Sequence, residues 1–362
     1  MNHIKIFQGN CLETLKNIPD GSINTCVTSP PYWGLRDYGT AEWVGGDPEC
    51  DHTINTGDID HIKQYQDRPF RGDRSKCLKC DAVRKDSQLG LENTPEEFVK
   101  NLVELFREVK RVLTEDGTIW VNLGDSYAGP KGNNRGEGAG GGQKRGKLLG
   151  FEDIKTKVPN GLKQKDLVGI PWRVAFALQE DGWYLRQDII WHKPNPMPES
   201  VRDRCTKAHE YIFLLSKNKK YYYDAEAIKE DAVGDRWGGD NFVPENSKYT
   251  EEKENFAHYV NARKKFIYEK RNKRSVWTVI TESYEDSHFA TYPKKLIEPC
   301  ILAACPEGGT VLDPFGGSGT TGVVAVAHNR NAVLCELNKD YIKIMEKRLD
   351  KELGMFHTRE II

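Results

Sequence analysis

The sequence predicts an α/β protein with a doubly wound, mostly parallel sheet that carries insertions. Segments of strand character alternate with segments of helical periodicity at both ends of the chain, the pattern of a parallel sheet covered by helices. A glycine-rich turn, PFGGSG at residues 314–319, stands between a strand and a helix. The 362 residues are 38% hydrophobic and 30% charged, so one large core can coexist with long polar loops.

The first thirty residues predict a compact strand–helix–strand unit. IKIFQG (4–9) alternates as a strand does, CLETLKNI (11–18) has the pattern of a short amphipathic helix, and NTCVTS (24–29) is a second strand ending at two prolines. Residues 34–93 show little periodicity and many Asp, Gly and Arg. They are predicted to be an insertion.

The middle of the chain returns to regular structure. Thr94 is predicted to cap a strong amphipathic helix whose first residue is Pro95, and a strand follows at 117–124. Residues 128–166 contain a glycine-rich run with no means of burying itself, so we expect a mobile loop there.

The second half repeats the alternation. The segments with strand or helix patterns are a helix at 170–182, strands at 183–193 and 207–217, a strand at 310–313, a helix at 320–329, a strand at 331–336 and a helix at 339–353. Residues 225–275 are polar, basic and dotted with aromatic side chains. They are predicted to be a second insertion.

Composition and charge narrow the class of protein. No run of 18 or more apolar residues exists, which excludes a spanning helix, and the first residues lack the layout of a secretory signal, so we expect a cytoplasmic protein. The odd count of nine cysteines argues against a disulfide framework. The net charge of −1 hides a stretch, 261–275, with seven basic residues against Glu269 alone. Such a stretch suits a polyanion or a solvated face.

The C-terminal glycine turn predicts a cofactor site. Gly317 to Gly322 matches G-x-G-x-x-G between a strand and a helix, and Glu336 follows 19 residues after Gly317 at the end of the next strand. Glycines let the backbone approach a ligand closely, and an acid at this place can accept hydrogen bonds from ribose hydroxyls. A dinucleotide and S-adenosylmethionine both satisfy this pattern.

A second motif lies near the N-terminus. Ser29-Pro30-Pro31-Tyr32 comes directly after an apolar strand, where open α/β sheets place their sites. The two prolines remove two N–H donors, so the Pro30 carbonyl can accept a hydrogen bond beside the Ser29 hydroxyl, and Tyr32 offers a face for stacking. These groups suit the exocyclic amine of a nucleobase taken out of its stack.

TSPPYWGLRDYG and LDPFGGSGTTG together resemble the amino-group DNA methyltransferases of restriction-modification systems, in the motif order of the β class. QGNCLETLKNIPDGSI (8–23), IIWHKPNPMPESVRDR (189–204), HEYIFLLSKNKKYYYD (209–224) and HFATYPKKLIEPCI (288–301) are also similar to that family. The resemblance implies a Rossmann-like methyltransferase fold, S-adenosylmethionine as methyl donor and a flipped base in double-stranded DNA as acceptor. The site residues that it implies are Ser29, Pro30, Pro31 and Tyr32 for catalysis, and Asn10, Asp313, Phe315, Gly317, Ser318, Gly319, Thr320 and Glu336 for the cofactor.

The target base follows from Ser29. Serine at the first motif position resembles the enzymes that methylate cytosine N4, whereas Asp or Asn is more frequent in those that methylate adenine N6. We therefore expect N4-methylcytosine, with N6-methyladenine as the alternative. A nicotinamide-dependent oxidoreductase and a non-catalytic DNA-binding module are the other classes considered, but neither uses both motifs.

A third pattern suggests a metal. Cys50-x-His52 is followed by Cys77-x-x-Cys80 inside the polar insertion, which has too few apolar residues to form its own core. Two cysteines, a further cysteine and a histidine suit a structural zinc ion.

We therefore expect one catalytic domain with inserted segments. The domain comprises residues 1–33, 94–224 and 276–362, and the inserted segments are a zinc-binding insertion at 34–93, a glycine-rich loop at 128–166 and a target-recognition insertion at 225–275. The expected partner is DNA, without a membrane, in a bacterium, archaeon or phage. A cognate restriction endonuclease is a candidate partner, and the oligomeric state is left open.

Overall fold

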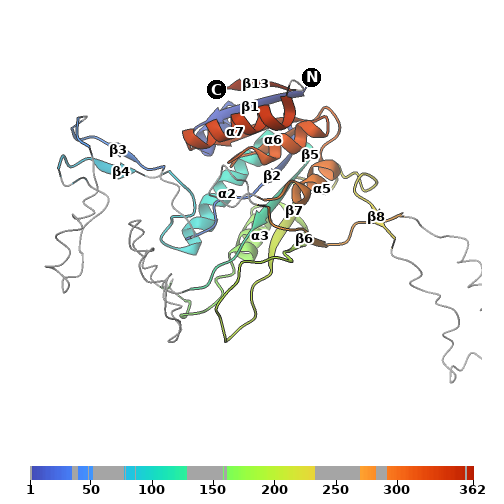
Figure 1. Cartoon of the computed structure of the whole chain (residues 1–362), viewed down its shortest axis with the longest axis horizontal. Coiled ribbons are helices and arrows are strands. Elements are labelled where there is room, and N and C mark those ends of the chain that lie inside the picture. The colour runs from blue at the N-terminus through green and yellow to red at the C-terminus, as the bar shows by residue number, and fades with distance from the viewer. Residues whose placement is uncertain are drawn as a thin grey trace, which may run out of the picture.

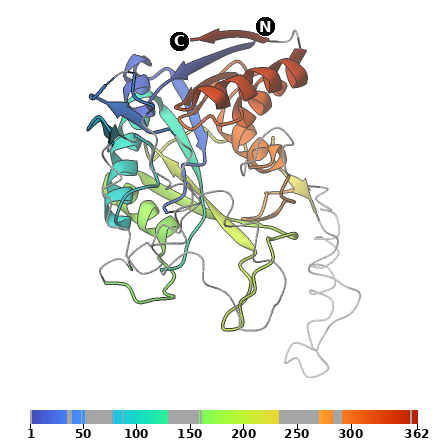
Figure 2. The ribbon, with the colours of Figure 1, turned by 60° about the vertical axis from the view of Figure 1, so that its left-hand side comes forward.

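The computed structural model describes residues 2–34, 40–47, 49–51, 77, 79–85, 87–128, 158, 161–232, 270–282, 292–354 and 357–362. These residues form a twisted nine-stranded sheet with helices on both faces (Figures 1 and 2). The predicted α/β class is confirmed. None of the described helices is long and apolar enough to cross a bilayer.

The strand order is β10-β6-β7-β5-β2-β11-β12-β1-β13, and β7 alone of the described strands in this sheet runs antiparallel to its neighbours. The strands are β1 (Asn2–Gln8), β2 (Ile23–Thr28), β5 (Leu113–Leu123), β6 (Tyr184–His192), β7 (His209–Ser216), β10 (Val276–Thr278), β11 (Thr310–Asp313), β12 (Asn331–Glu336) and β13 (His357–Ile361). The carboxyl ends of the parallel strands and the amino end of β7 therefore meet at one edge of the sheet.

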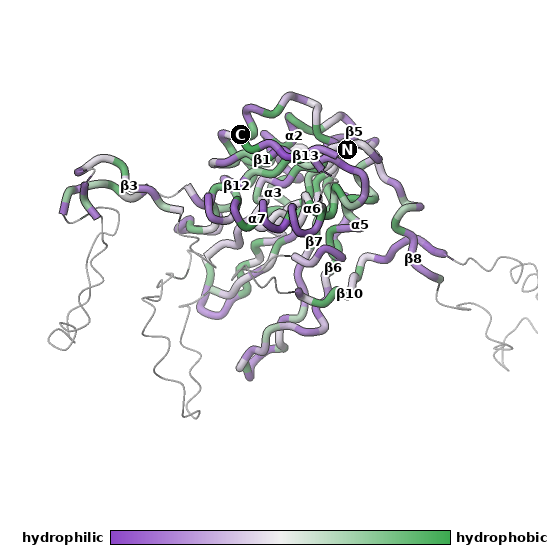
Figure 3. Tube along the Cα trace, turned by 45° about the horizontal axis from the view of Figure 1, so that its top comes forward, coloured by the Kyte–Doolittle hydropathy of each residue, from purple (hydrophilic) through white to green (hydrophobic). Residues whose placement is uncertain are grey.

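Helices cover the two faces in separate groups. One face carries α1 (Cys11–Thr14), the short 3₁₀ turn η1 (Leu15–Asn17), α2 (Pro95–Val112) and α3 (Ile170–Glu180). The other carries α5 (Lys294–Ala304), α6 (Thr320–Ala327) and α7 (Lys339–Leu353). Each group packs its apolar side chains on the sheet, so the core consists of two layers. Hydrophobic residues gather on the central strands in Figure 3, whereas the trace around β8 (Glu230–Asp231) is hydrophilic.

Local sequence signals predict the bounds of most helices and strands closely. Helix α2 begins at Pro95 and is capped as predicted, because the Thr94 side chain accepts a hydrogen bond from the Glu97 amide at 3.1 Å. The single helix predicted over 11–18 is instead α1 followed by η1. Pro19 follows this segment, and side-chain contacts from α2 take up the carbonyls that a longer helix would need.

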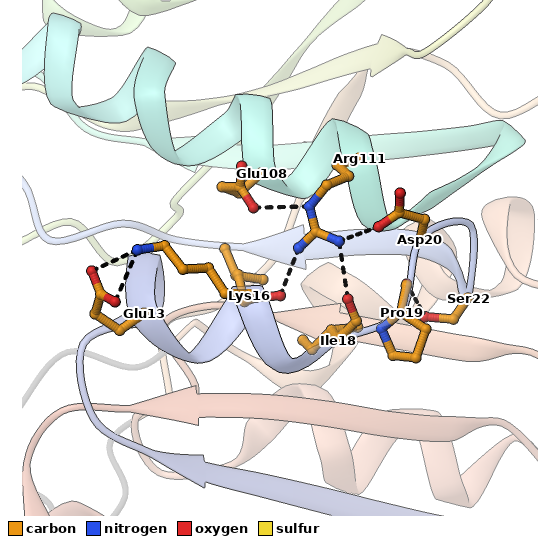
Figure 4. Close-up of polar contacts among 9 residues, drawn as sticks. Glu13, Lys16, Ile18, Pro19, Asp20, Ser22, Glu108 and Arg111 are labelled. Atoms are coloured by element: carbon orange, nitrogen blue, oxygen red, sulfur yellow. Dashed lines mark hydrogen bonds and ion pairs between the residues drawn. The ribbon is translucent and has the colours of Figure 1, made fainter.

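Arg111 makes those contacts (Figure 4). It donates from Nη2 to the Leu15 carbonyl at 2.8 Å, from Nη1 to the Ile18 carbonyl at 3.1 Å, and it pairs with Asp20 and Glu108. Arg111 therefore joins the C-terminal turn of α2 to the connection between β1 and β2.

Two small hairpins mark the predicted insertions. Strands β3 (Glu42–Val44) and β4 (Val83–Lys85) pair outside the large sheet, and β8 pairs with β9 (Lys270–Arg271). The glycine-rich run and most of the basic stretch lie outside the described residues. At the ends of the former, Tyr127 and Leu167 form an antiparallel bridge.

Candidate active site at the carboxyl edge of the sheet

A cavity of about 320 Å³ opens at the carboxyl edge of the sheet. Residues following β1, β2, β11 and β12 line it, together with side chains of β5, β6 and β7. The predicted site residues among its lining are Asn10, Ser29, Pro30, Pro31, Tyr32, Phe315, Gly317, Ser318, Thr320 and Glu336. Two motifs from opposite ends of the sequence therefore face one space, because β2 and β11 are neighbours in the sheet.

The segment from Ser29 to Tyr32 leaves β2 directly into the cavity. Gly90 packs against its backbone, where an added Cβ would lie 3.0 Å from the Tyr32 carbonyl oxygen. Gly124 lies against the Tyr32 ring, and a Cβ there would come within 2.5 Å of Cε2. This packing fixes the orientation of the ring that lines the cavity.

A polar network holds the Tyr32 hydroxyl. It donates to Glu210 Oε2 at 2.7 Å and to Asn122 Oδ1 at 3.2 Å, and Asn122 Nδ2 also donates to Glu210 Oε2 at 3.2 Å. The other carboxylate oxygen of Glu210 pairs with the Lys193 ammonium. All four residues line the cavity, so this network is part of its wall.

Lys193 is a fixed cation. Its Nζ lies 4.1 Å from the centroid of the Trp191 ring, and the Trp191 Nε1 donates to the Val279 carbonyl at 2.8 Å. A carboxylate and an aromatic face thus position the ammonium together. The neighbouring His192 instead contacts Thr278 across the β6–β10 pair at 3.1 Å, and it is not among the cavity-lining residues.

The glycine turn lines the same cavity as this network. Gly317 and Gly319 have positive φ angles of 50° and 78°, and a Cβ at Gly319 would lie 2.6 Å from Met345 Cγ. These values explain why the turn needs glycine. Arg348 of α7 fixes the two side chains next to Gly319, because its Nη1 donates to Ser318 Oγ and Thr320 Oγ1 at 2.8 Å each.

Glu336 holds the same turn from the end of β12. Its Oε2 accepts from the Gly317 amide and its Oε1 from the Asn338 amide, both at 2.8 Å. Burial raises the pKa of Glu336 above its ordinary value despite these amides. On the neighbouring segment, Asn10 Oδ1 accepts from the Leu12 amide at 2.9 Å and caps α1.

Asp313 lies behind the cavity wall and is 1% exposed. One oxygen accepts from Thr28 Oγ1 at 2.6 Å and from the Phe315 amide at 3.1 Å. The other accepts from Tyr292 OH at 2.8 Å and Thr321 Oγ1 at 2.6 Å. Asp313 therefore joins the residue before Ser29 to the glycine turn. Gly319 is likewise absent from the cavity lining.

The predicted metal ligands lie in the hairpin region. The Sγ atoms of Cys50, Cys77 and Cys80 lie within 4.8 Å of one another, whereas His52 is outside the described residues. The structure thus brings together the three described members of the predicted set.

Several residues of the site were missed by motif reading. Lys193 and Glu210 lie in stretches similar to the methyltransferase family, but no local pattern assigns them a role. Arg348 carries a clearer signal, because it interrupts the apolar face that Met345 and Leu349 present on α7. A buried arginine on such a face needs several acceptors.

Comparison with known proteins covers almost the whole chain. A family model described as DNA methylase matches residues 23–347. Type II methyltransferase M.Cfr9I of Citrobacter freundii is 41% identical over 352 residues, which cover 97% of this chain and 89% of that protein. Type II methyltransferase M.SmaI of Serratia marcescens is 40% identical over 345 residues, which cover 95% and 90%.

A solved structure is similar in fold. The PvuII DNA methyltransferase (cytosine-N4-specific) has a TM-score of 0.55 at 16% identity, and the match covers 98% of this chain and 92% of that one.

Proposed function

Because the chain belongs to the DNA methylase family, we propose that it transfers a methyl group from S-adenosylmethionine to the exocyclic N4 of a cytosine in double-stranded DNA. The observation that carries the proposal is the meeting of the Ser29–Tyr32 segment and the glycine turn around one cavity. Family membership favours methyl transfer over the nicotinamide-dependent oxidoreductase and the non-catalytic DNA-binding module.

The cofactor half of the cavity consists of the glycine turn, Glu336, Asn10 and Phe315. The Glu336 carboxylate is oriented by two backbone amides, and its remaining lone pairs suit the two hydroxyls of a ribose. The Phe315 ring supplies an apolar surface beside Gly317, where the chain can approach a ligand without a Cβ. These residues therefore fit the nucleoside part of S-adenosylmethionine.

The acceptor half of the cavity consists of the Ser29–Tyr32 segment and the polar network around the Tyr32 hydroxyl. It must activate a weak nucleophile. The lone pair of a base amine is delocalised into the ring, and hydrogen bonds from its two protons to Ser29 Oγ and the Pro30 carbonyl favour a more tetrahedral nitrogen. S-Adenosylmethionine supplies an electrophilic methyl carbon, so that the N–C bond forms as the S–C bond breaks and the extra proton on nitrogen leaves for solvent. The chain contributes alignment, which is worth roughly 7–11 kcal/mol in well-oriented reactions.

Lys193 supports cytosine as the target. The Watson–Crick edge of cytosine carries two acceptors, N3 and O2, beside its amine, whereas adenine carries N1 alone. A fixed ammonium in the cavity wall suits the base with more acceptors. Adenine N6 is the second candidate, because Ser29 and Pro30 can accept from either amine.

The target base must leave the DNA double helix to reach this cavity. The loop between β6 and β7 projects beyond the carboxyl edge of the sheet (Figure 2) and carries Met197, which is 85% exposed. Asn195 Oδ1 accepts from the Thr281 amide at 3.1 Å and secures the start of the loop. An exposed methionine between prolines suits a wedge between base steps. We propose that this loop and the 225–275 insertion meet the DNA.

Nucleoside mass spectrometry tests the proposal. The full chain is incubated with DNA of varied sequence and labelled S-adenosylmethionine, and N4-methylcytosine is expected. N6-methyladenine as the sole product would overturn the assignment of cytosine as the target base. It would leave the assignment of the cofactor and acceptor halves unchanged. Cofactor affinity measured by calorimetry is expected to survive in Ser29→Ala and fall in Glu336→Ala. Equal affinity in both variants would contradict the division into halves.

The biological role follows from the curated relatives, which are named type II methyltransferases. We propose that the chain modifies cytoplasmic DNA and protects it from a cognate restriction endonuclease. Resistance of the methylated DNA to an endonuclease of matching specificity, and cleavage of DNA treated with Ser29→Ala, would support this role. Cleavage of both DNAs would refute it.

A further inference from the structure

Three thiols converge beside the β3–β4 hairpin, and none of them lines the cavity. The Sγ atoms of Cys50, Cys77 and Cys80 lie within 4.8 Å of one another, and those of Cys50 and Cys77 are 3.8 Å apart. Zn–S bonds of about 2.3 Å in a tetrahedral site place two sulfurs about 3.8 Å apart. A disulfide requires about 2.05 Å. The separation therefore matches two ligands of one metal ion.

The backbone presents these thiols from two tight turns. In the first, the Cys50 amide donates to the Asp47 carbonyl at 3.0 Å. In the second, the Asp81 amide donates to the Cys77 carbonyl at 3.0 Å, and Asp81 has a positive φ of 57°. The Cys77 amide in turn donates to the Ala82 carbonyl at 2.7 Å. The Cys-x-x-Cys segment is thus a closed loop that directs both of its sulfurs to one side.

The two turns fit against each other closely. A Cβ at Gly46 would lie 2.7 Å from both the carbonyl oxygen and the Sγ of Cys80. Gly46 also has a positive φ of 74°. Only glycine allows the first turn to approach the second Cys-x-x-Cys sulfur this closely.

The hairpin lacks an apolar core of its own among the described residues. Strands β3 and β4 have three residues each, and their valines, Val44 and Val83, are 47% and 37% exposed. An isolated two-stranded hairpin is marginally stable in water. Small units of this kind commonly use a disulfide or a metal, and the 3.8 Å between the Cys50 and Cys77 sulfurs is not a disulfide distance.

The hairpin continues directly into the cavity wall. Thr40 precedes β3 and lines the cavity, as do Ser87, Gln88 and Leu89 after β4. The next residue, Gly90, accepts from the Gly34 amide at 2.7 Å and packs on the Tyr32 backbone. A link across the hairpin therefore restrains the wall that faces the Ser29–Tyr32 segment.

We propose that the thiolates of Cys50, Cys77 and Cys80 bind a structural zinc ion that holds this wall. Thiolate sulfur is the ligand that zinc prefers in structural sites, and none of the three cysteines is among the residues that line the cavity. Metal binding is independent of the proposed methyl transfer and does not rest on that function.

The test compares Cys77→Ser and Cys80→Ser with Cys205→Ser, a control at an exposed cysteine outside the cluster. Freshly purified full chain and the control are expected to contain about one zinc per chain, and the two cluster variants to contain less than about a tenth of that. Cobalt exchanged into the full chain should give the intense charge-transfer absorption of thiolate ligands, and Cys205→Ser should retain it.

The metal measurements do not depend on methyl-transfer activity. Circular dichroism and cofactor binding establish whether each variant keeps the main sheet, since the hairpin lies outside it. Zinc-free chain with unchanged hairpin protection from hydrogen exchange would overturn the proposal. Zinc retained equally in all variants would also overturn it, because the ion would then lie elsewhere. Zinc bound by a chain that methylates nothing would leave the metal site standing and refute the proposed function.

Discussion

Replacing Tyr32 by phenylalanine separates the two roles of this side chain. The substitution keeps the ring that packs on Gly124 and removes the hydroxyl that donates to Glu210 at 2.7 Å. A hydrogen bond to a charged group is worth about 1.5–3 kcal/mol. Glu210 keeps its contacts with Lys193 and Asn122, so the lower half of that range applies. A loss near 1.5 kcal/mol corresponds to a rate about tenfold lower.

Tyr32→Ala removes the ring as well. Stacking of a base on an aromatic side chain is worth roughly 1–3 kcal/mol, so turnover should fall about five- to 150-fold below that of the phenylalanine variant. Tyr184→Phe is the control, because Tyr184 is an exposed tyrosine at the start of β6, outside the cavity lining.

The assay is single-turnover methyl transfer with saturating cofactor. Cofactor affinity should stay within twofold in both Tyr32 variants, because Tyr32 lies in the acceptor half. Equal rates for Tyr32→Phe and Tyr32→Ala would refute the stacking role. A wild-type rate for Tyr32→Phe would refute the role of the polar network.

Three further predictions concern the framework of the site. Gly319→Ala should lower the melting temperature and the cofactor affinity, because it adds a clash to the strain of positive φ; Gly308→Ala, with φ of 75° and open space, measures the strain alone. Burial raises the pKa of Glu336, so its contribution to stability is fully present below the ordinary value of about 4.5 and is lost as the pH rises through the raised pKa. Without cofactor, the stability of Glu336→Gln relative to wild type should therefore increase as the pH rises from 4 to neutrality, and thermal unfolding that shows the opposite trend would contradict the burial argument. Arg111→Ala should destabilise the chain by about 1–3 kcal/mol in urea unfolding, because the Ile18 carbonyl loses its Arg111 donor and the Leu15 carbonyl keeps only the Ile18 amide. Lys16→Ala, which removes only an exposed ion pair, should cost less than about 0.5 kcal/mol.

Much of the fold could be predicted because its signals are local. The cap at Thr94, the apolar run of β11 and the glycine turn all act within a few residues of sequence. Helix α5 was not predicted, since Pro299 in its interior breaks the helical pattern. Strand β13 was also not predicted, because its sequence HTREI is polar and becomes a strand only by pairing with β1.

The residues of the candidate site divide in the same way, into those with a local sequence signal and those whose role depends on distant strands. Ser29, Tyr32 and Glu336 stand in motifs whose chemistry can be read from neighbouring residues. Glu210 and Lys193 could not be assigned, because their roles depend on β6 and β7 meeting the end of β2 across the sheet. No spacing within either strand encodes that meeting.

The position of β1 has a consequence for synthesis of the protein. Strand β1 leaves the ribosome before every other strand of this sheet, yet its two neighbours in the sheet are β12 and β13, more than 320 residues further along the chain. Such long-range pairing forms late, because the closure of so large a loop must precede any contact. A nascent chain that has not delivered β12 and β13 therefore exposes β1 as an unpaired strand during translation. Chaperones that bind extended apolar segments, and the rate at which the segment carrying β12 and β13 is synthesised, should therefore affect the yield of folded protein.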